Sequence, residues 1–371
     1  FFQMKGSFEE CDAKSQHVGD VHSSSSSSNS SSSSSKTTID YTFHLLDDSS
    51  KIFSIDPTQT VQDIVGHVIY SQYPDITELR VYSIQLDSNR DEWLDPKKSL
   101  QQQDVANNAT LLLRKKYWCD FVERGNADNP VQCHINFIQS RYRILSGKQR
   151  ISRQQAISLG ALQVQIEYGN YDETKLRDLN VQQFFCPKFV QKKKALKQDL
   201  VKAWQLLMGC SERGGKFRYC QECRQLTHWG VDFFPIEVPQ RRKLIPKILG
   251  ISEKGIVLCD PKNDMKIIKS HPWIRVKRWA ASKKLITIDF GDYESDYLKG
   301  LTMESEKISN LISGYIDFLL KPPQSKCRLP PILDYPDGAL AIPQTVNEVV
   351  AQKVSEVVVS EVVPQEVSED P

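Results

Sequence analysis

The spacing of apolar residues between positions 38 and 321 changes twice, and this change constrains the fold more than any other feature of the chain. Residues 38–116 mostly alternate between apolar and polar, residues 117–228 repeat at a period near 3.6, and residues 229–321 alternate again before one final helical stretch. Alternation is typical of strands, and a period of 3.6 is typical of helices. The sequence therefore predicts an α+β protein of three successive lobes, which fits a length of 371 residues.

The first predicted lobe, 38–116, begins with a β-hairpin. Residues 41–45 and 51–55 alternate, and the polar residues between them supply turn chemistry. Thr60 then caps an amphipathic helix, and further strands are predicted at 79–84 and 110–113. A hairpin, one helix and then more strands is the order of a ubiquitin-like β-grasp fold.

The second predicted lobe, 117–228, is a helical bundle. Helical spacing is clear at 137–145, 153–159 and 196–207, with one further turn near 181–185.

The third predicted lobe, 229–321, is a β-sandwich of the pleckstrin-homology or phosphotyrosine-binding (PTB) type. One apolar stripe from Ile308 to Leu319 predicts a C-terminal helix that closes the sandwich. The predicted strands are 231–238, 244–249, 256–259, 266–268, 276–281 and 285–290.

Both ends of the chain are predicted to be disordered tails. Residues 1–37 contain a serine run from Ser23 to Ser35 that is broken only by Asn29, and such a run buries no apolar surface. Residues 322–371 are rich in Pro and then in Val and Glu. An alternative for this acidic end is a segment that docks on the basic surfaces described below.

Composition excludes several classes of protein. No run approaches about 18 apolar residues, so no transmembrane helix is expected. Forty-eight Lys and Arg residues against 46 Asp and Glu argue against a general nucleic-acid binder. Nine scattered cysteines favour reduced thiols in a cytoplasmic protein. The sequence also lacks phosphate-loop, dinucleotide-binding and H-E-x-x-H motifs, so we predict no enzyme activity and no cofactor.

Two basic clusters are candidate binding sites for acidic phospholipids. Residues 188–224 hold ten Lys and Arg against three acids, and a second cluster lies in the third lobe. Such clusters attract anionic membrane surfaces, whereas RNA binding would favour interleaved aromatic platforms. For a single lysine, a solvated surface position is the simpler interpretation. The predicted lipid-binding residues are Lys192, Lys193, Lys194, Lys216, Arg218, Arg224, Arg241, Arg242, Lys243 and Lys247.

One cysteine–histidine group resembles a zinc site. It consists of Cys210, Cys220, Cys223 and His228, with a C-x2-C spacing. Because residues 219–226 are predicted to form one helix and only one pair is tightly spaced, we favour buried thiols and predict no metal.

The strand predicted at 276–281 is a candidate edge for peptide addition, in which an extended segment pairs with unpaired backbone groups. Arg278 and Trp279 are adjacent, so they point to opposite faces of the strand. Trp279 either completes the core of the sandwich or faces a partner.

The order of the three lobes resembles the FERM module, and several strings in that order look like the talin family. The strings cover much of residues 40–321. They lie at 93–95, 110–116, 128–132, 243–251, 276–282, 288–293 and 312–317.

This resemblance implies a non-enzymatic adaptor at the inner plasma membrane and at cell-adhesion sites. Arg278, Trp279 and Ala280 would contact an NPxY-type motif of an integrin β cytoplasmic tail. Leu244 and Lys243 would meet the membrane-proximal helix of that tail. The alternatives are an ezrin-like or kindlin-like FERM scaffold, or the FERM part of a truncated signalling enzyme.

Three departures from the talin pattern affect these expectations. Talins carry an additional ubiquitin-like lobe before this module, which residues 1–36 are too short and too polar to form. The first lobe has only a short link from Ile84 to Trp93 where talins have a long basic insertion, so membrane binding through that loop is not expected. The helical rod is absent, so any cytoskeletal partner would bind outside these residues.

Overall fold

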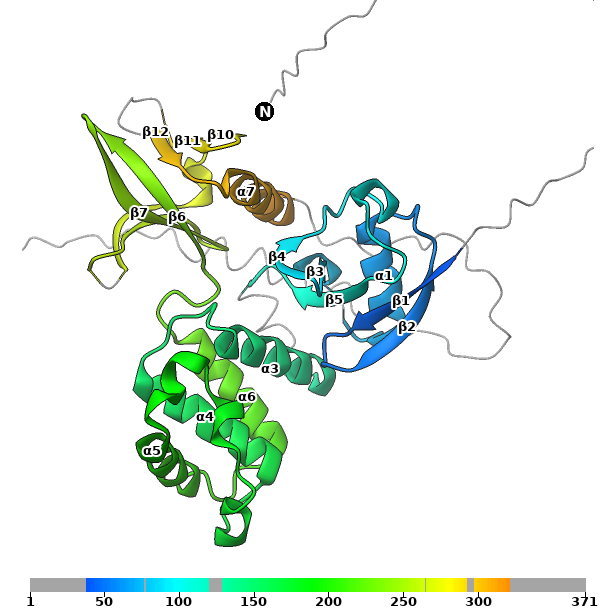
Figure 1. Ribbon diagram of the computed structural model, residues 1–371, viewed down its shortest axis with the longest axis vertical. Coiled ribbons are helices and arrows are strands. Elements are labelled where there is room, and N and C mark those ends of the chain that lie inside the picture. Colours follow the sequence, from blue (N-terminus) through cyan, green and yellow to red (C-terminus); the bar gives the residue numbers. More distant parts are fainter. Residues whose placement is uncertain (1–37, 77, 120–128, 264, 292–296, 321–371) are drawn as a thin grey trace, which may run out of the picture. The chain divides into compact units, whose positions relative to one another are not determined.

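A computed structural model describes residues 38–76, 78–119, 129–263, 265–291 and 297–320 (Figure 1). Both predicted tails lie outside the described residues. Contacts within the chain define two compact units, which divide after Ile64, between Val81 and Tyr82, and after Lys116. The first unit holds a five-stranded sheet, and the second holds the helical lobe and a seven-stranded sheet.

The sheet of the first unit has the strand order β2-β1-β5-β3-β4. β1 and β2 form the predicted antiparallel hairpin, and β5 runs parallel to β1. In the hairpin turn, Asp47 Oδ1 accepts hydrogen bonds from the Ser49 amide at 3.1 Å and from its hydroxyl at 2.6 Å. The strands are β1 Ile39–His44, β2 Ser50–Ile55, β3 Tyr82–Leu86, β4 Asn89–Trp93 and β5 Thr110–Lys115.

The predicted helix of this lobe is α1, Val61–Gln72. Thr60 Oγ1 accepts the Asp63 amide at 3.2 Å and donates to the Asp63 carboxylate at 2.6 Å, which satisfies one of the free donors at the helix start. The apolar face predicted from the sequence is buried: Val61, Ile64, Val65, Val68 and Ile69. The strand predicted at 79–84 is partly wrong, because Leu79–Val81 forms a 3-10 turn and the strand begins at Tyr82.

Four helices form the core of the helical lobe: α3 Pro130–Leu145, α4 Arg153–Tyr168, α5 Lys193–Gln205 and α6 Glu212–Arg224. α4 packs against both α5 and α6, and α3 packs against α6. Trp204 is fully buried, and its indole N–H donates to Gln165 Oε1 at 3.0 Å and to the Gly169 carbonyl at 2.9 Å. A buried indole with a satisfied donor anchors α5 to the end of α4.

The start of α3 explains why this helix begins earlier than periodicity alone indicated. Asn129 Oδ1 accepts the amides of Val131 at 2.9 Å and Gln132 at 3.2 Å. Pro130 occupies the first helical position, where a missing N–H costs nothing.

The third lobe is a β-sandwich of seven antiparallel strands with one C-terminal helix, as predicted. The strand order is β10-β11-β12-β6-β7-β8-β9, so β9 and β10 are the two edges. The strands are β6 Asp232–Gln240, β7 Lys243–Ser252, β8 Gly255–Asp260, β9 Lys266–His271, β10 Arg278–Ser282, β11 Leu285–Asp289 and β12 Tyr297–Leu301. The helix is α7 Ser305–Leu320.

Several details of this lobe differ from the sequence prediction, and β7 and β9 each continue three residues beyond their predicted ends. β12 was not predicted, and β10 begins two residues later than expected. The delay arises because Trp273–Arg275 form a 3-10 turn, after which Val276 is buried before the strand begins.

Candidate peptide-binding edge and basic surfaces

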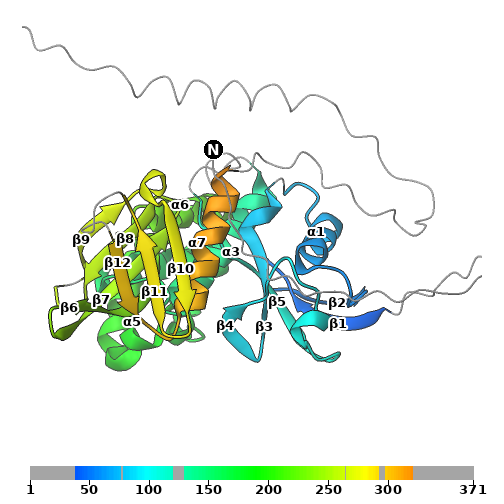
Figure 2. The same cartoon turned by 90° about the horizontal axis from the view of Figure 1, so that it is seen from above.

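The strand β10 lies at one edge of the sandwich, and among the described residues its only strand neighbour is β11. α7 packs against β10 and β11 (Figure 2). The hairpin between β10 and β11 has a two-residue turn, with Ser282 opposite Leu285. In such hairpins the closing pair is hydrogen-bonded, so by alternation Trp279 and Ala281 direct their backbone N–H and C=O groups outward. The edge thus has backbone groups positioned to accept a further strand.

The predicted site residues on β10 are accessible. Arg278 and Ala280 are exposed, and Trp279 is half-buried. The indole is therefore not enclosed in the core. An aromatic ring that is partly packed and partly accessible beside an open strand edge is suited to contact a peptide.

Arg278 is held in place by two partners that sequence reasoning did not identify. Its Nε donates to Asp289 Oδ2 at 2.7 Å, and its Nη2 donates to the Tyr297 hydroxyl at 2.6 Å. Asp289 lies directly opposite Arg278 in the β10–β11 register, so strand pairing could have revealed the first contact. The contact with Tyr297 could not be predicted in the same way, because Tyr297 lies on β12, a strand that the sequence did not indicate.

Arg278 and Asp289 each stabilise the charged form of the other. Burial raises the pKa of the Asp289 carboxyl, but hydrogen bonds from Arg278, Tyr297 and the Gly291 amide outweigh burial and hold that pKa below its usual value. The hydrogen bond to Asp289 is the largest cause that raises the pKa of Arg278. The guanidinium is thus a fixed positive charge beside the open edge, although 75% of its side chain is exposed.

The predicted residues of the β6–β7 hairpin form an exposed basic tip. Arg241 and Arg242 are the two turn residues, and both are exposed. Lys243 is exposed, and Leu244 keeps half of its surface accessible. Lys247 is half-buried further along β7 and lines a cavity of 560 Å³.

The predicted basic residues of the helical lobe differ in their surroundings. Lys216 pairs with Glu212 one turn away, and Arg218 Nε lies 3.0 Å from Glu222 Oε1. Arg224 is half-buried at the end of α6. The side chains of Lys192, Lys193 and Lys194 lie outside the described part of the structure.

In the described residues, the cysteine–histidine group of the helical lobe is not arranged as a metal centre. Cys220 and Cys223 are buried on α6, and Cys210 is partly buried before it. Within the described ranges, no cluster of three or more His, Cys, Asp or Glu side chains is arranged to hold a metal ion.

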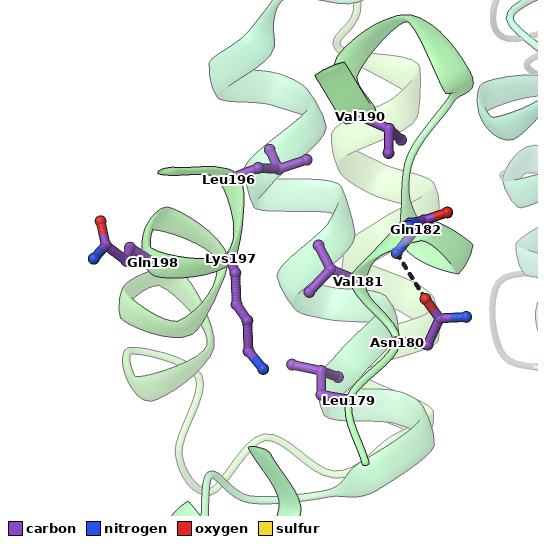
Figure 3. Close-up of a pocket in the computed structure, with 8 residues that line it drawn as sticks. All are labelled: Leu179, Asn180, Val181, Gln182, Val190, Leu196, Lys197 and Gln198. Atoms are coloured by element: carbon purple, nitrogen blue, oxygen red, sulfur yellow. Dashed lines mark hydrogen bonds between the residues drawn. The ribbon is translucent and has the colours of Figure 1, made fainter. Parts of the chain in front are cut away.

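The helical lobe also has a cavity of 480 Å³ (Figure 3). Its lining residues are Leu179, Asn180, Val181, Gln182, Val190, Leu196, Lys197 and Gln198. The ammonium group of Lys197 donates to the Leu176 carbonyl at 3.0 Å. The wall is otherwise apolar or amide, so it presents no group of ionisable side chains for chemistry.

No helix in the described part of the chain has the length and apolar character required to cross a bilayer.

Comparisons with known proteins give the class of this fold. The FERM central domain family matches residues 124–234, and the IRS-1-type PTB domain family matches residues 235–320. The FERM and C-terminal domain complex of Drosophila Merlin has a similar fold, with a TM-score of 0.64 at 17% identity, over 76% of this chain and 96% of that chain. The human Myosin 7b MyTH4-FERM structure gives a TM-score of 0.58 at 14% identity, over 77% of this chain and 61% of that chain. The three lobes with their open PTB-type edge therefore constitute a FERM module.

The relatives that are similar in sequence are talins. Talin-B of Dictyostelium discoideum is 36% identical over 282 residues, which is 75% of this chain and 11% of talin-B. Talin-2 of Homo sapiens is 36% identical over 245 residues, which is 64% of this chain and 9% of talin-2. The chain belongs to the talin family as a FERM-containing part, and it spans about a tenth of the length of these two relatives.

Proposed function

We propose that this talin-family FERM adaptor binds the cytoplasmic tail of an integrin β subunit by strand addition at β10. The observation that supports this function best is the outward-facing backbone of Trp279 and Ala281 on an edge strand. A guest segment would pair with these groups, and its side chains would contact the half-buried indole of Trp279 and the exposed Ala280. Arg278, fixed by Asp289 and Tyr297, would present a positive charge beside the guest.

Leu244 and Lys243 form a second proposed contact, with the membrane-proximal helix of the same tail. Leu244 is an apolar side chain that keeps 50% of its surface exposed next to three basic residues. An amphipathic helix with an acidic or polar border would cover this leucine and meet the surrounding positive charge.

The basic clusters are proposed to hold the module against the inner leaflet of the plasma membrane through acidic phospholipids. Arg241, Arg242 and Lys243 are exposed together at the tip of the β6–β7 hairpin, which supports this role. Each basic residue near an anionic surface contributes about 1 kcal/mol. Attachment would raise the effective concentration of a weak peptide site. The proposed role is that of a non-enzymatic link between adhesion receptors and the cytoskeleton.

Replacing Trp279 with Ala is expected to weaken binding of an integrin β-tail peptide by about 1–3 kcal/mol, the range for an aromatic anchor at an interface. Fluorescence anisotropy of a labelled peptide titrated with wild type and W279A would measure this difference. Ile274→Ala is a matched control, because Ile274 belongs to the same lobe, is 86% exposed and lies outside β10. If wild type and a folded W279A bound the peptide with equal affinity, Trp279 would not be part of the binding site.

Reversing Arg241 and Arg242 to Glu is expected to reduce binding to vesicles containing phosphatidylserine about tenfold or more, given about 1 kcal/mol per basic residue. Wild-type binding should also fall steeply as salt is added. Co-sedimentation with these vesicles and with neutral phosphatidylcholine vesicles measures both effects. Reversal of Lys97 and Lys98, two exposed lysines outside both clusters, should have little effect. Salt-insensitive pelleting would contradict an electrostatic attachment.

A further inference from the structure

The opposite edge of the sandwich, β9, has a surface that the proposed function does not use. Among the described residues β9 pairs only with β8, so its outer backbone edge is open. Ile267 and Ile268 keep 43% and 46% of their surfaces exposed, and Lys266 and Lys269 flank them. Lys269 pairs with Leu258 and Ile267 pairs with Cys259, so Ile268 is the extra residue of a β-bulge and the alternation of side chains is interrupted there.

An open edge with exposed β-branched residues can pair with another strand through its free backbone N–H and C=O groups. Flanking lysines normally protect such an edge, because they repel a second copy of the same strand. The same lysines favour an acidic partner. Among the described residues, neither Lys266 nor Lys269 forms an ion pair, so both charges can interact with an incoming strand. The edge therefore fits a strand that is apolar, β-branched and negatively charged.

The chain itself contains a segment with this composition. Residues 348–363 include eight valines, three glutamates and one lysine. Valine is among the residues that favour strands most strongly. Within this segment, residues 356–363 read Glu-Val-Val-Val-Ser-Glu-Val-Val.

The segment is long enough to reach β9. α7 ends at Leu320, and 35 residues separate it from Glu356. A flexible chain of that length spans about 30–35 Å on average, and the diameter of a lobe of this size is about 30 Å. The length of the connection therefore allows the segment to contact either edge of the sandwich.

We propose that β9 is a second strand-addition edge, and that its occupant is residues 356–363 of the same chain. When Glu356 or Glu361 is placed opposite Lys266 in the parallel direction, a valine of the segment falls beside Ile267. β9 suits this segment better than β10, because β10 has alanines at its centre and its Arg278 is already bonded to Asp289. Occupation of β9 leaves β10 accessible, so this inference is independent of integrin binding.

Hydrogen–deuterium exchange of the 371-residue chain tests this inference at the amides of residues 266–271. An effective concentration of about 1 mM against a Kd of about 0.1 mM predicts roughly tenfold slower exchange in the occupied edge. Glu356→Lys with Glu361→Lys should remove that protection. Adding Lys266→Glu and Lys269→Glu to the same chain should restore it. Exchange within β7 serves as the reference for an intact sandwich.

The matched control is Glu366→Lys with Glu369→Lys, which changes the charge equally outside the segment and should leave exchange at β9 unchanged. Equal exchange at β9 in wild type and in the Glu356→Lys, Glu361→Lys chain would overturn the proposal. Protection that disappears on dilution would also overturn it, because the occupant would then be a second copy. An overturned result here would leave the β10 titration unaffected.

Discussion

Replacing Arg143 with Ala is expected to lower the free energy of unfolding of the unit that contains the helical lobe and the sandwich by about 3 kcal/mol. This is the lower end of the range for breaking a buried ion pair, because the Asp232 side chain keeps 29% of its surface exposed. Arg143 is buried on α3, and its guanidinium donates to the Asp232 carboxylate at 3.0 Å and to the Val231 carbonyl at 2.7 Å. The guanidinium also lies 5.1 Å from the Trp118 ring centroid. One side chain thus joins the helical lobe to the first strand of the sandwich, and its loss leaves Asp232 without this partner.

Chemical denaturation monitored by tryptophan fluorescence would measure this loss. The matched control is Arg153→Ala, which removes an exposed pair with Asp199 at 2.8 Å. An exposed pair contributes only about 0–1 kcal/mol. If R143A and R153A had the same free energy of unfolding, the proposed joint between the two lobes would be wrong.

Replacing Gly314 with Ala is expected to destabilise the same unit by about 1–3 kcal/mol through overpacking. A Cβ atom at this position would lie 1.8 Å from the Tyr117 hydroxyl oxygen and 2.6 Å from its Cζ. Tyr117 is buried, with its ring edge-on to Tyr315 at 5.0 Å and stacked near Phe318 at 6.4 Å. The ring is enclosed by these neighbours, so α7 or Tyr117 must shift.

A loss of stability on Gly314→Ala would indicate a packing clash, whereas a gain would indicate that helix propensity dominates. Gly to Ala within a helix normally stabilises by about 0.5–1 kcal/mol. Gly66 lies within α1 and has no heavy atom within 4 Å of an added Cβ, so Gly66→Ala should show that normal gain. Thermal unfolding of both variants measures the contrast. A gain at both positions would show that Tyr117 does not restrict α7.

Patterns local in sequence predicted most elements of the fold. The hairpin of β1 and β2, the Thr60 cap and the apolar stripe of α7 all depend on residues a few positions apart. β4 was missed because Asn89–Trp93 is almost entirely polar, and its strand form depends on pairing with β3. β12 was missed because Gly300 weakens its strand signal. The side chain of Ile236 approaches this glycine, and an added Cβ would lie 3.0 Å from Ile236 Cδ1.

The candidate site was predictable only in part for the same reason. The sequence indicated Arg278 and Trp279 on an edge strand, and β10 is an edge strand in the structure. The partners of Arg278 lie 11 and 19 residues away, on two other strands. The partner of Arg143 lies 89 residues away in another lobe. Such contacts are set by tertiary packing, which single-sequence periodicity does not encode.

The proposed function depends on pairing between the backbone of β10 and a guest strand. Amide exchange at Trp279 and Ala281, followed by NMR while an NPxY-containing integrin β-tail peptide is added, tests it most directly. We expect both amides to exchange about tenfold more slowly at a peptide concentration ten times the Kd, while the Ala280 amide, which faces β11, changes little. Peptide binding that leaves the exchange of Trp279 and Ala281 unchanged would contradict strand addition at this edge.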